Sequence, residues 1–314
     1  MREVLVGVDV GGTKTHVAVA DESRVIADSV VPSVGWNPRP WADGAARLVD
    51  VLDGVHPDWR EAASVVVGAH GCDSPEQSAA LQAALSRAAG RRCLVHNDAE
   101  LVLPSAGLRE GVAIIAGTGS IASGHRAGAA AITVGGWGWL LGDEGSAPSL
   151  VREAIRAVVG RHDSGLPPDA LGDRLLRAFD VHSVNDLIVV ASHKAGVPGW
   201  SAHARTVFDA VADGSRDAAE VVRSAARELA TLVQRLRMRG VPTDDVVLAG
   251  GVARSQPLLG ECVGQALAER HIYARVQTLS VPPVTGALML AARDAGWRTG
   301  PPCLQPQRSE VSAR

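Results

Sequence analysis

The chain lacks the cysteine patterns that mark metal-bound or disulfide-linked proteins. Its 314 residues include four cysteines, and no two of them form a CxxC pair. Single cysteines that lie far apart argue against a zinc knuckle, an iron–sulfur ligand set and a disulfide framework. A reducing, cytoplasmic environment therefore fits the sequence best. The four positions are Cys72, Cys93, Cys262 and Cys303.

Long apolar runs and basic segments are also missing. No uncharged apolar run reaches the roughly 18 residues that a membrane span needs, and the first apolar run is broken at Asp9, too early for a signal-peptide core. The formal net charge is −3, and the 29 arginines and 2 lysines are spread among acidic residues. This mixture is typical of solvated helix faces. We expect a soluble protein that binds neither membranes nor nucleic acid.

What the chain does contain is an alternation of short apolar runs and amphipathic segments. Its length allows two domains, and 46% hydrophobic with 21% charged residues is typical of a globular protein. The mixed order predicts an α/β fold whose hairpins make the sheets partly antiparallel. Strands are expected near 4–8, 16–20, 25–31, 64–69, 93–96, 112–116, 246–249 and 273–278. Helices are expected near 41–55, 75–89, 218–236, from 255 onward and 284–295.

The second half of the chain begins as the first half does. An apolar run at 112–116 leads into a glycine turn at 117–120, and a second apolar segment follows, as in the first twenty residues. This weak internal repeat predicts two related lobes. Between 146 and 240 the sequence is mainly helical, and the segment at 218–236 keeps one apolar face over five turns. That helix is interpreted as scaffold.

Three glycine turns each follow a predicted buried strand. Glycine lets backbone N–H groups approach an anion closely, and neighbouring hydroxyl groups add donors. One such turn is weak evidence, because most are simply tight turns. Three in one chain indicate a clamp on a polyphosphate, the first two holding the β- and γ-phosphates and the third lying under the nucleoside. The candidate ATP-binding residues are Gly11, Gly12, Thr13, Lys14, Thr118, Gly119, Gly250 and Gly251.

The common nucleotide motifs are absent. The chain has no GxxxxGK[ST] P-loop and no dinucleotide fingerprint followed by an acidic residue at the right distance, so ATP must be held in another way. Asp9, at the end of the first strand, could organise Mg²⁺ through its bound waters. The alternative, in which Asp9 only starts a turn, is equally compatible with its spacing.

Asp98 is the candidate catalytic base. Phosphoryl transfer needs a carboxylate that orients the attacking hydroxyl and accepts its proton, and Asp98 follows a buried strand. The alternative is that Asp98 caps the following helix. His70 also follows a strand, where a histidine with only structural contacts is the more common case.

A block rich in glycine, tryptophan and acids spans residues 135–146. Sugars are bound by planar acceptors on adjacent hydroxyls and by apolar ring faces, so Trp137, Asp143 and Glu144 have suitable chemistry. The alternatives are that the two acids charge the first turn of the next helix and that the tryptophans are core. Asn37 could bond a sugar hydroxyl, although Asn before Pro is a common turn former.

Five segments together resemble the N-acetylglucosamine kinase branch of the BadF/BadG/BcrA/BcrD ATPase family, within the actin and hexokinase superfamily. The block at 135–147 is the most specific of them, since the glycine loops are shared across the superfamily. The segments are VGVDVGGTKTHVAVAD (6–21), HNDAELVLPSAG (96–107), GVAIIAGTGSIASG (111–124), GGWGWLLGDEGSA (135–147) and VVLAGGVARSQPLL (246–259).

The resemblance implies an ATP- and Mg²⁺-dependent kinase for a small amino sugar. N-acetylglucosamine, phosphorylated at position 6, is the first candidate, while glucosamine and N-acetylmuramic acid stay open. Asp98 matches the family's catalytic base, and the turns at 11–14, 117–120 and 250–251 match the nucleotide loops. The sugar pocket would include Asn37, Gly71, Asp98, Thr118, Gly136, Trp137 and Asp143.

The fold implied by the resemblance is two RNase H-like lobes that close over their substrates in a cleft. The first lobe would hold residues 1–110 and about 281–298, the second 111–280, and 299–314 would be a loose tail. Two departures stand out. His70 replaces an expected small residue, which puts the preferred sugar in question. The helical insert is short, so homodimer contacts are not carried over and a homodimer stays open.

Three other classes of protein fit the sequence less well than a sugar kinase. An ATPase that activates a dehydratase through a shared iron–sulfur cluster needs cysteines beside the second lobe's helix, and none is so placed. A sugar-binding repressor needs a helix-turn-helix domain, which is not expected before residue 4. A kinase with structural zinc needs a cysteine-rich loop, which this sequence lacks.

Overall fold

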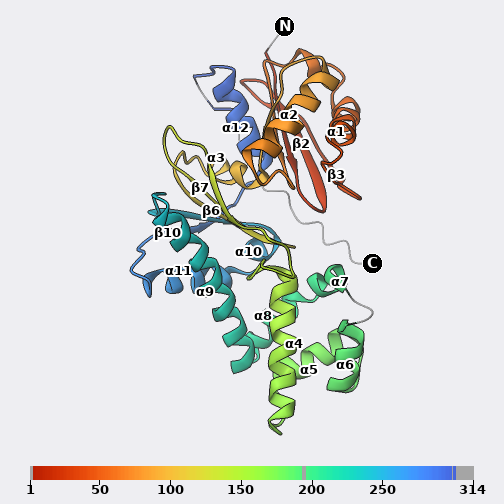
Figure 1. The fold of residues 1–314 in the computed structure, drawn as a ribbon, viewed down its shortest axis with the longest axis vertical. Helices are drawn as coiled ribbons and strands as arrows, with labels where there is room; N and C mark the ends of the chain where they lie inside the picture. The colour runs from red at the N-terminus through yellow and green to blue at the C-terminus, as the bar shows by residue number, and fades with distance from the viewer. Residues whose placement is uncertain (1–2, 193–195, 299, 302–314) are drawn as a thin grey trace. The chain divides into compact units, whose positions relative to one another are not determined.

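The computed structural model describes residues 3–192, 196–298 and 300–301. The chain divides into an N-terminal unit, residues 1–109 with 279–314, and a C-terminal unit, residues 110–278. Each unit is a five-stranded mixed sheet with helices packed against it (Figure 1). The described helices include none with the length and apolarity that a membrane span requires. The expected tail at 299–314 lies outside the described residues, apart from 300–301.

The N-terminal sheet has the strand order β3-β2-β1-β4-β5. The first three strands form an antiparallel meander, which confirms the predicted hairpin, and β4 and β5 run parallel to β1. Because β1, β4 and β5 are parallel, their carboxyl ends lie at one edge of the sheet. The strands are β1 (Leu5–Val10), β2 (Lys14–Ala20), β3 (Val25–Pro32), β4 (Ser64–Ala69) and β5 (Leu94–His96).

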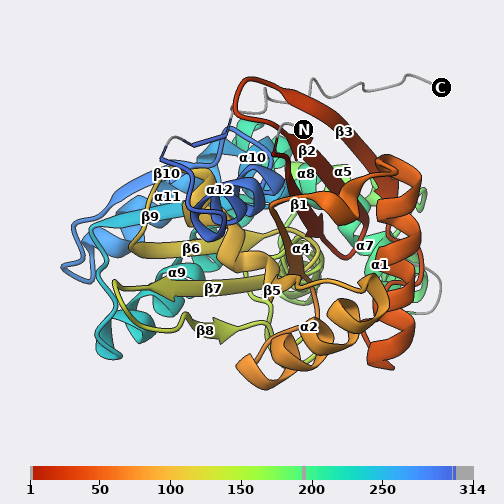
Figure 2. The same ribbon diagram turned by 90° about the horizontal axis from the view of Figure 1, so that it is seen from above.

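Helices cover both faces of this sheet. On β1, Val6, Val8 and Val10 alternate toward the core that contains α1 (Trp41–Val55) and α2 (Pro75–Ala89). The opposite face packs against α12 (Val284–Asp294), so closely that a Cβ on Gly7 would lie 2.9 Å from the Leu288 nitrogen. Figure 2 shows α12 beside the first strands of this unit. The last helix therefore belongs to the first sheet despite the long sequence separation.

Three short helical segments complete the N-terminal unit. They are η1 (Trp59–Glu61), η2 (Asp98–Leu101) and α3 (Val102–Ser105). The start of α2 is the one that the sequence predicts: the Ser74 hydroxyl accepts the Gln77 N–H at 3.3 Å and Pro75 occupies the first helical position.

The C-terminal sheet repeats the topology of the first. Its order is β10-β9-β6-β7-β8, with β6 and β7 forming a hairpin and β9 parallel to β6. Read from its other end, the order β8-β7-β6-β9-β10 matches β3-β2-β1-β4-β5 strand for strand. The internal repeat is therefore confirmed. The strands are β6 (Gly111–Ala116), β7 (Ser120–His125), β8 (Ile132–Gly135), β9 (Asp245–Ala249) and β10 (Arg275–Thr278). The sequence did not predict β8, which has four half-buried residues and no clear alternation.

The helices of the C-terminal unit lie mostly between β8 and β9 in the sequence. The predicted apolar face of α9 is buried, which confirms its role as scaffold. The helix expected from about Ser255 is α11, with Gln256 at its cap and Pro257 at its first position, and a separate short helix, α10, precedes it and ends at Ser255. The helices are α4 (Ala147–Asp163), α5 (Ala170–Ala178), α6 (Val184–Val190), α7 (Gly196–Ala202), α8 (Ala204–Ala212), α9 (Arg216–Met238), α10 (Gly251–Ser255) and α11 (Pro257–Ala268).

Candidate functional site

Strand register brings three segments of the N-terminal unit to one edge. Asp9 pairs with Gly68 across β1 and β4, and Gly68 pairs with His96 across β4 and β5. Two residues further along each of these three segments, the chain reaches Gly11 in the β1–β2 turn, His70 after β4 and Asp98 after β5. The predicted base, the predicted metal ligand and the first glycine turn are therefore neighbours at the carboxyl edge of one sheet.

Asn97, and not Asp98, is the cap of the helix that follows β5. The Asn97 side chain accepts the Ala99 N–H at 2.9 Å, and Glu100 accepts the Asn97 backbone N–H at 3.1 Å, which completes a capping box. Asp98 occupies the first turn, where its Oδ1 also accepts the Ala99 N–H at 3.0 Å. The alternative that Asp98 serves as the cap is wrong, because its neighbour has that role.

Asn97 also ties together the two loops that flank the candidate base. It is 2% exposed, and its Nδ2 donates to the Cys72 carbonyl at 3.2 Å and to Asp73 Oδ1 at 3.0 Å. A buried side chain with partners on both sides cannot rotate without leaving polar groups unpaired. The position of Asp98 relative to the β4–α2 loop is therefore fixed by hydrogen bonds.

Two carboxyl groups at this edge have raised pKa values. Burial, together with the negative charge of Asp98, raises the pKa of Asp9 to about 7, although Lys14 opposes the shift. Burial also raises the pKa of Asp98 to about 6, where His70 lowers it and Asp73 raises it. Raised carboxyl pKa values are typical of functional sites, since they make the carboxylate a better proton acceptor at neutral pH.

His70 lies directly beside the candidate base. Its Nδ1 is 3.8 Å from Asp98 Oδ2, and its side chain is 59% exposed. The His70 backbone is held on both sides, since its N–H donates to the Val10 carbonyl at 2.8 Å and its carbonyl accepts the Trp36 indole N–H at 3.0 Å. The ring is thus presented to solvent next to Asp98.

The loop that carries Asn37 packs against Gly71. Gly71 has φ +82°, and a Cβ there would lie 3.1 Å from Pro38 Cγ, so a larger residue would strain both the backbone and the contact. Asn37 is exposed, and its side-chain oxygen accepts the Arg39 N–H at 3.0 Å. Asn37 and Gly71, two predicted sugar-pocket residues, are therefore close in the N-terminal unit. Asn37 also forms a turn, which was the alternative to a role in sugar binding.

The first glycine turn is short and exposed to solvent. The Gly11 N–H donates to the Lys14 carbonyl at 2.9 Å, and the Thr13 carbonyl accepts the Ser33 N–H at 3.0 Å. Gly12, Thr13 and Lys14 are exposed. These hydrogen bonds close the turn and leave the side chains of Thr13 and Lys14 on its outer surface.

In the C-terminal unit, the second and third glycine turns are in contact. They follow the adjacent parallel strands β6 and β9, and a Cβ on Gly117 would lie 3.6 Å from the Gly251 nitrogen. Gly250 has φ +96°, and a Cβ there would lie 2.4 Å from the Ala116 carbonyl oxygen. Only glycine allows this approach. The fold thus brings together two glycine turns that lie far apart in the sequence and that were predicted to bind ATP.

The glycine- and tryptophan-rich block lies beside the second turn. Trp137 is 74% exposed and Trp139 is 43% exposed, so the alternative that both tryptophans are core is wrong. A Cβ on Gly119 would lie 3.0 Å from Asp143 Oδ2. Gly136 has φ +73° and donates its N–H to the Ser120 carbonyl at 2.9 Å.

Asp143 and Glu144 precede α4 without joining it. The helix begins at Ala147 with Ser146 as its cap, and its first turn contains no acidic residue. Asp143 has φ +60°, a conformation that non-glycine residues adopt rarely. The alternative that these two acids charge the first turn of α4 is therefore wrong.

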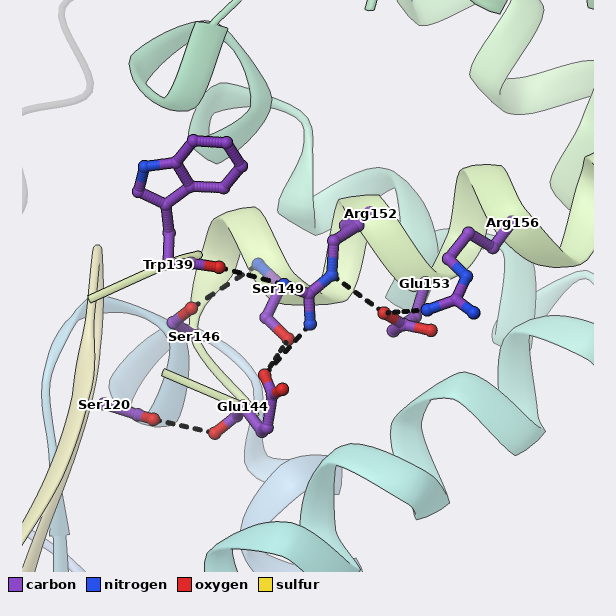
Figure 3. Close-up of polar contacts among 8 residues, drawn as sticks. All are labelled: Ser120, Trp139, Glu144, Ser146, Ser149, Arg152, Glu153 and Arg156. Atoms are coloured by element: carbon purple, nitrogen blue, oxygen red, sulfur yellow. Dashed lines mark hydrogen bonds and ion pairs between the residues drawn. The ribbon is translucent and has the colours of Figure 1, made fainter. Parts of the chain in front are cut away.

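Glu144 is the centre of a polar network (Figure 3). Its carbonyl accepts the Ser120 hydroxyl at 2.7 Å, and its Oε2 accepts Ser149 Oγ at 3.2 Å and Arg152 Nη2 at 3.0 Å. The sequence pointed to neither Ser149 nor Arg152, and to Ser120 only as part of the second glycine turn. No local motif could have revealed them, because the contacts depend on how α4 packs beside the loop.

The described residues include no group of three or more His, Cys, Asp or Glu side chains that could hold a metal ion. Cys72, Cys93 and Cys262 are free thiols, and Cys303 lies outside the described residues. A metal in this chain would need ligands from water or substrate, which is how Mg²⁺ is usually bound with nucleotides.

Comparison with known proteins places the chain in a family. The model of the BadF/BadG/BcrA/BcrD ATPase family matches residues 6–291. The chain belongs to this ATPase family. Its relatives include the N-acetylmuramic acid/N-acetylglucosamine kinase of Clostridium acetobutylicum, which is 26% identical over 91% of this chain and 97% of its own length. The N-acetyl-D-glucosamine kinase of Dictyostelium discoideum is 26% identical over 92% and 98%.

Solved structures with this fold include two sugar kinases. A candidate N-acetylglucosamine kinase from Chromobacterium violaceum has a TM-score of 0.69 at 20% identity, covering 92% of this chain and 99% of its own. The glucokinase of the ROK family from Streptomyces griseus, in complex with glucose and AMPPNP, has a TM-score of 0.59 at 17% identity, with 92% and 99% covered. At these identities the likeness establishes the fold, two actin-like lobes, as expected from the sequence.

Proposed function

We propose that the chain is an ATP-dependent kinase that phosphorylates a small amino sugar. The observation that carries the proposal is the position of Asp98, which follows the parallel strand β5, is 16% exposed and has a pKa raised to about 6. Such a carboxylate is ionised at neutral pH and can still accept a proton as the sugar hydroxyl attacks. Membership of an ATPase family supports ATP as the phosphoryl donor.

In this proposal, the protein mainly positions the two substrates and stabilises the charge of the transition state. Phosphoryl transfer through a loose transition state needs little covalent help, so catalysis comes from orientation and charge. Asp98 would orient the acceptor hydroxyl and take its proton. The backbone N–H groups of the glycine turns would bind the phosphates through the positive ends of their dipoles, and the Lys14 ammonium would bind them through its positive charge.

Asp9 is the proposed contact to Mg²⁺, through water. The negative charge of Asp98 disfavours ionisation of Asp9, and a divalent cation would relieve that repulsion. The absence of a larger ligand group among the described residues suits an ion that keeps most of its waters and binds phosphate oxygens. When bound with ATP, Mg²⁺ neutralises charge on the transferred phosphoryl group.

N-acetylglucosamine is the first candidate for the sugar, with the 6-hydroxyl as acceptor. Both curated relatives carry this sugar in their names. The exposed Trp137 ring offers an apolar surface of the kind that stacks on sugar rings, and Asp143 offers a bidentate acceptor for adjacent hydroxyls. Asn37 and Gly71 are the proposed sugar contacts of the N-terminal unit, and Thr118 and Gly136 those of the C-terminal unit.

A second candidate is N-acetylmuramic acid, and glucosamine is a third. The relative from Clostridium acetobutylicum is named for both N-acetylmuramic acid and N-acetylglucosamine. The exposed imidazole of His70 beside Asp98 favours this alternative, because a protonated ring could pair with the lactyl carboxylate that distinguishes N-acetylmuramic acid.

The proposal is tested by a coupled assay of ADP release. The full chain with ATP and Mg²⁺ is offered N-acetylglucosamine, N-acetylmuramic acid, glucosamine, N-acetylmannosamine and glucose in turn, and Asp98→Asn serves as the control for contaminating kinases. We expect one amino sugar to raise ADP release well above the basal rate. If no sugar does so, the kinase proposal fails and an ATPase that activates a partner enzyme becomes the better interpretation.

A further inference from the structure

Arg152 connects helix α4 to the loop that carries the proposed sugar residues (Figure 3). Its Nη1 donates to the Trp139 carbonyl at 2.9 Å and its Nη2 to Glu144 Oε2 at 3.0 Å, while Nε donates to Glu153 Oε1 at 2.8 Å. The side chain is 24% exposed. One guanidinium thus holds two points of the loop, five residues apart, against a rigid helix.

The rest of the loop is held by local backbone turns, by the Gly136 N–H that donates to the Ser120 carbonyl at 2.9 Å, and by an edge-on contact of the Trp139 and Trp200 rings. Gly136, Gly138, Asp143 and Gly145 all have positive φ values, so this stretch has no regular secondary structure. Leu140 and Leu141 are 73% and 81% exposed, so these two side chains do not anchor it in the core. The left-handed conformation of Asp143 costs free energy, and it persists only where surrounding contacts impose it.

The two points that Arg152 holds lie close in sequence to the proposed sugar residues. Trp139 follows Trp137 by two positions, and Glu144 follows Asp143 directly. From the other side of the loop, the Ser120 hydroxyl fixes the Glu144 carbonyl at 2.7 Å. Asp143 is therefore next to a residue held through both its main chain and its side chain.

We propose that Arg152 is a positioning residue for the sugar site, acting through Glu144 and the Trp139 carbonyl. This inference rests on the proposed function. Arginine is required because its planar fork presents several N–H donors in fixed directions, whereas a lysine ammonium is a single point on a flexible stem. Lysine at 152 keeps the charge and cannot hold both the Trp139 carbonyl and Glu144 in the same geometry.

The chain supplies a matched control on the same helix. Arg156 lies one turn after Arg152, and it also bonds Glu153, at 3.4 Å. Its side chain is 73% exposed, and none of its contacts in Figure 3 reaches the loop. The comparison of Arg152→Lys with Arg156→Lys therefore separates the loop contact from the general loss of an arginine on α4.

The test is steady-state kinetics of the full chain with the sugar that the wild type accepts. For Arg152→Lys we expect the KM for the sugar to rise about 10- to 100-fold, the value of one charged hydrogen bond, with the KM for ATP within about twofold of wild type. Arg156→Lys should match the wild type in both constants. An unchanged sugar KM for Arg152→Lys, or an equal rise for ATP, would overturn the inference.

Chemical rescue provides a second measurement that a loss of folding would not produce. Arg152→Ala leaves a space beside Glu144, and added guanidinium at low millimolar concentration should lower the sugar KM of this variant while sodium at the same ionic strength does not. Absence of rescue in a variant whose melting temperature equals that of the wild type counts against the inference. If the wild type phosphorylates no sugar, the proposed function fails first, and the two failures remain distinct.

Discussion

The Nδ1 atom of His70 lies 3.8 Å from Oδ2 of Asp98, at the carboxyl edge of the N-terminal sheet. A protonated imidazole at this distance favours the ionised form of the carboxyl group. It therefore lowers the pKa of Asp98, against the burial and the Asp73 charge that raise it. Asp9 and Lys14 also lie at this edge, together with the pair of His96 and Glu100. His70 thus helps to set the pH at which the proposed base becomes active.

Replacement of His70 should move the acid limb of the pH–rate profile. In His70→Ser the favourable charge is lost, so the pKa of Asp98 rises and the decline of kcat with falling pH begins at higher pH than in the wild type. His96→Gln is the control, because His96 lies at the same edge but pairs with Glu100 at 3.4 Å. The measurement is kcat from pH 5 to 8. Identical limbs in His70→Ser and wild type would contradict the assignment.

Asp98→Asn should remove the base and preserve the fold. We expect kcat to fall about 10²- to 10⁴-fold, the usual contribution of a general base. ATP affinity and melting temperature should stay near the wild-type values, because Asn97 and not Asp98 forms the cap and the loop tether. Equilibrium dialysis and thermal unfolding check those two points. An Asp98→Asn enzyme that turns over at the wild-type rate would show that another group accepts the proton.

The ionised form of Asp9 should lower the free energy of unfolding above neutral pH. Its pKa is raised from 3.8 to about 7 in the folded chain, so between about pH 4 and 7 the folded state binds more protons than the unfolded state. Stability therefore falls as pH rises through this window. Asp9→Asn removes the buried charge and should melt several degrees above the wild type at pH 8, with the difference shrinking toward pH 4. The expected loss of kinase activity in the same variant separates the functional role from the structural cost.

Acylation should detect ATP at the first glycine turn. The chain has two lysines, Lys14 and Lys194, and Lys14 is exposed in that turn. Because a bound phosphate would cover the Lys14 ammonium, ATP with Mg²⁺ should slow its acylation by an N-hydroxysuccinimide ester. Peptide mass spectrometry reports both sites, and Lys194, which lies outside the described residues, is the internal reference. Equal rates at Lys14 with and without ATP would argue against the phosphate contact.

Gly250 and Gly251 should respond differently to the same substitution. Gly250→Ala places a Cβ 2.4 Å from the Ala116 carbonyl oxygen at a positive φ, and should destabilise the C-terminal unit. A Cβ on Gly251 meets nothing within 4 Å, so Gly251→Ala should keep the melting temperature. If Gly251 lies under the nucleoside, the same variant should raise the KM for ATP. A normal KM in Gly251→Ala would move the nucleoside away from this turn.

Local sequence patterns determined much of the fold because their causes are local. The apolar face of α9, the bounds of α2 and the glycine turns after β1, β6 and β9 depend on residues a few positions apart, and all were predicted. Capping signals were harder to interpret, since Asn97 and Asp98 are both good caps and only the structure shows which residue is used. Trp137 is exposed although tryptophan side chains are mostly buried, and Asp143 has a positive φ, which residues other than glycine adopt rarely.

The sequence by itself determined the strand–turn units, the repeat that relates the two sheets, and the family resemblance that the matched model bears out. Only the tertiary structure decided which of these residues meet. Strand register aligned Asp9, His70 and Asp98 at one edge, and the packing of α4 brought Arg152 to the loop at 136–146. Such contacts join positions separated along the chain, and their geometry is set by hydrogen-bonded register and side-chain packing, which no local pattern specifies.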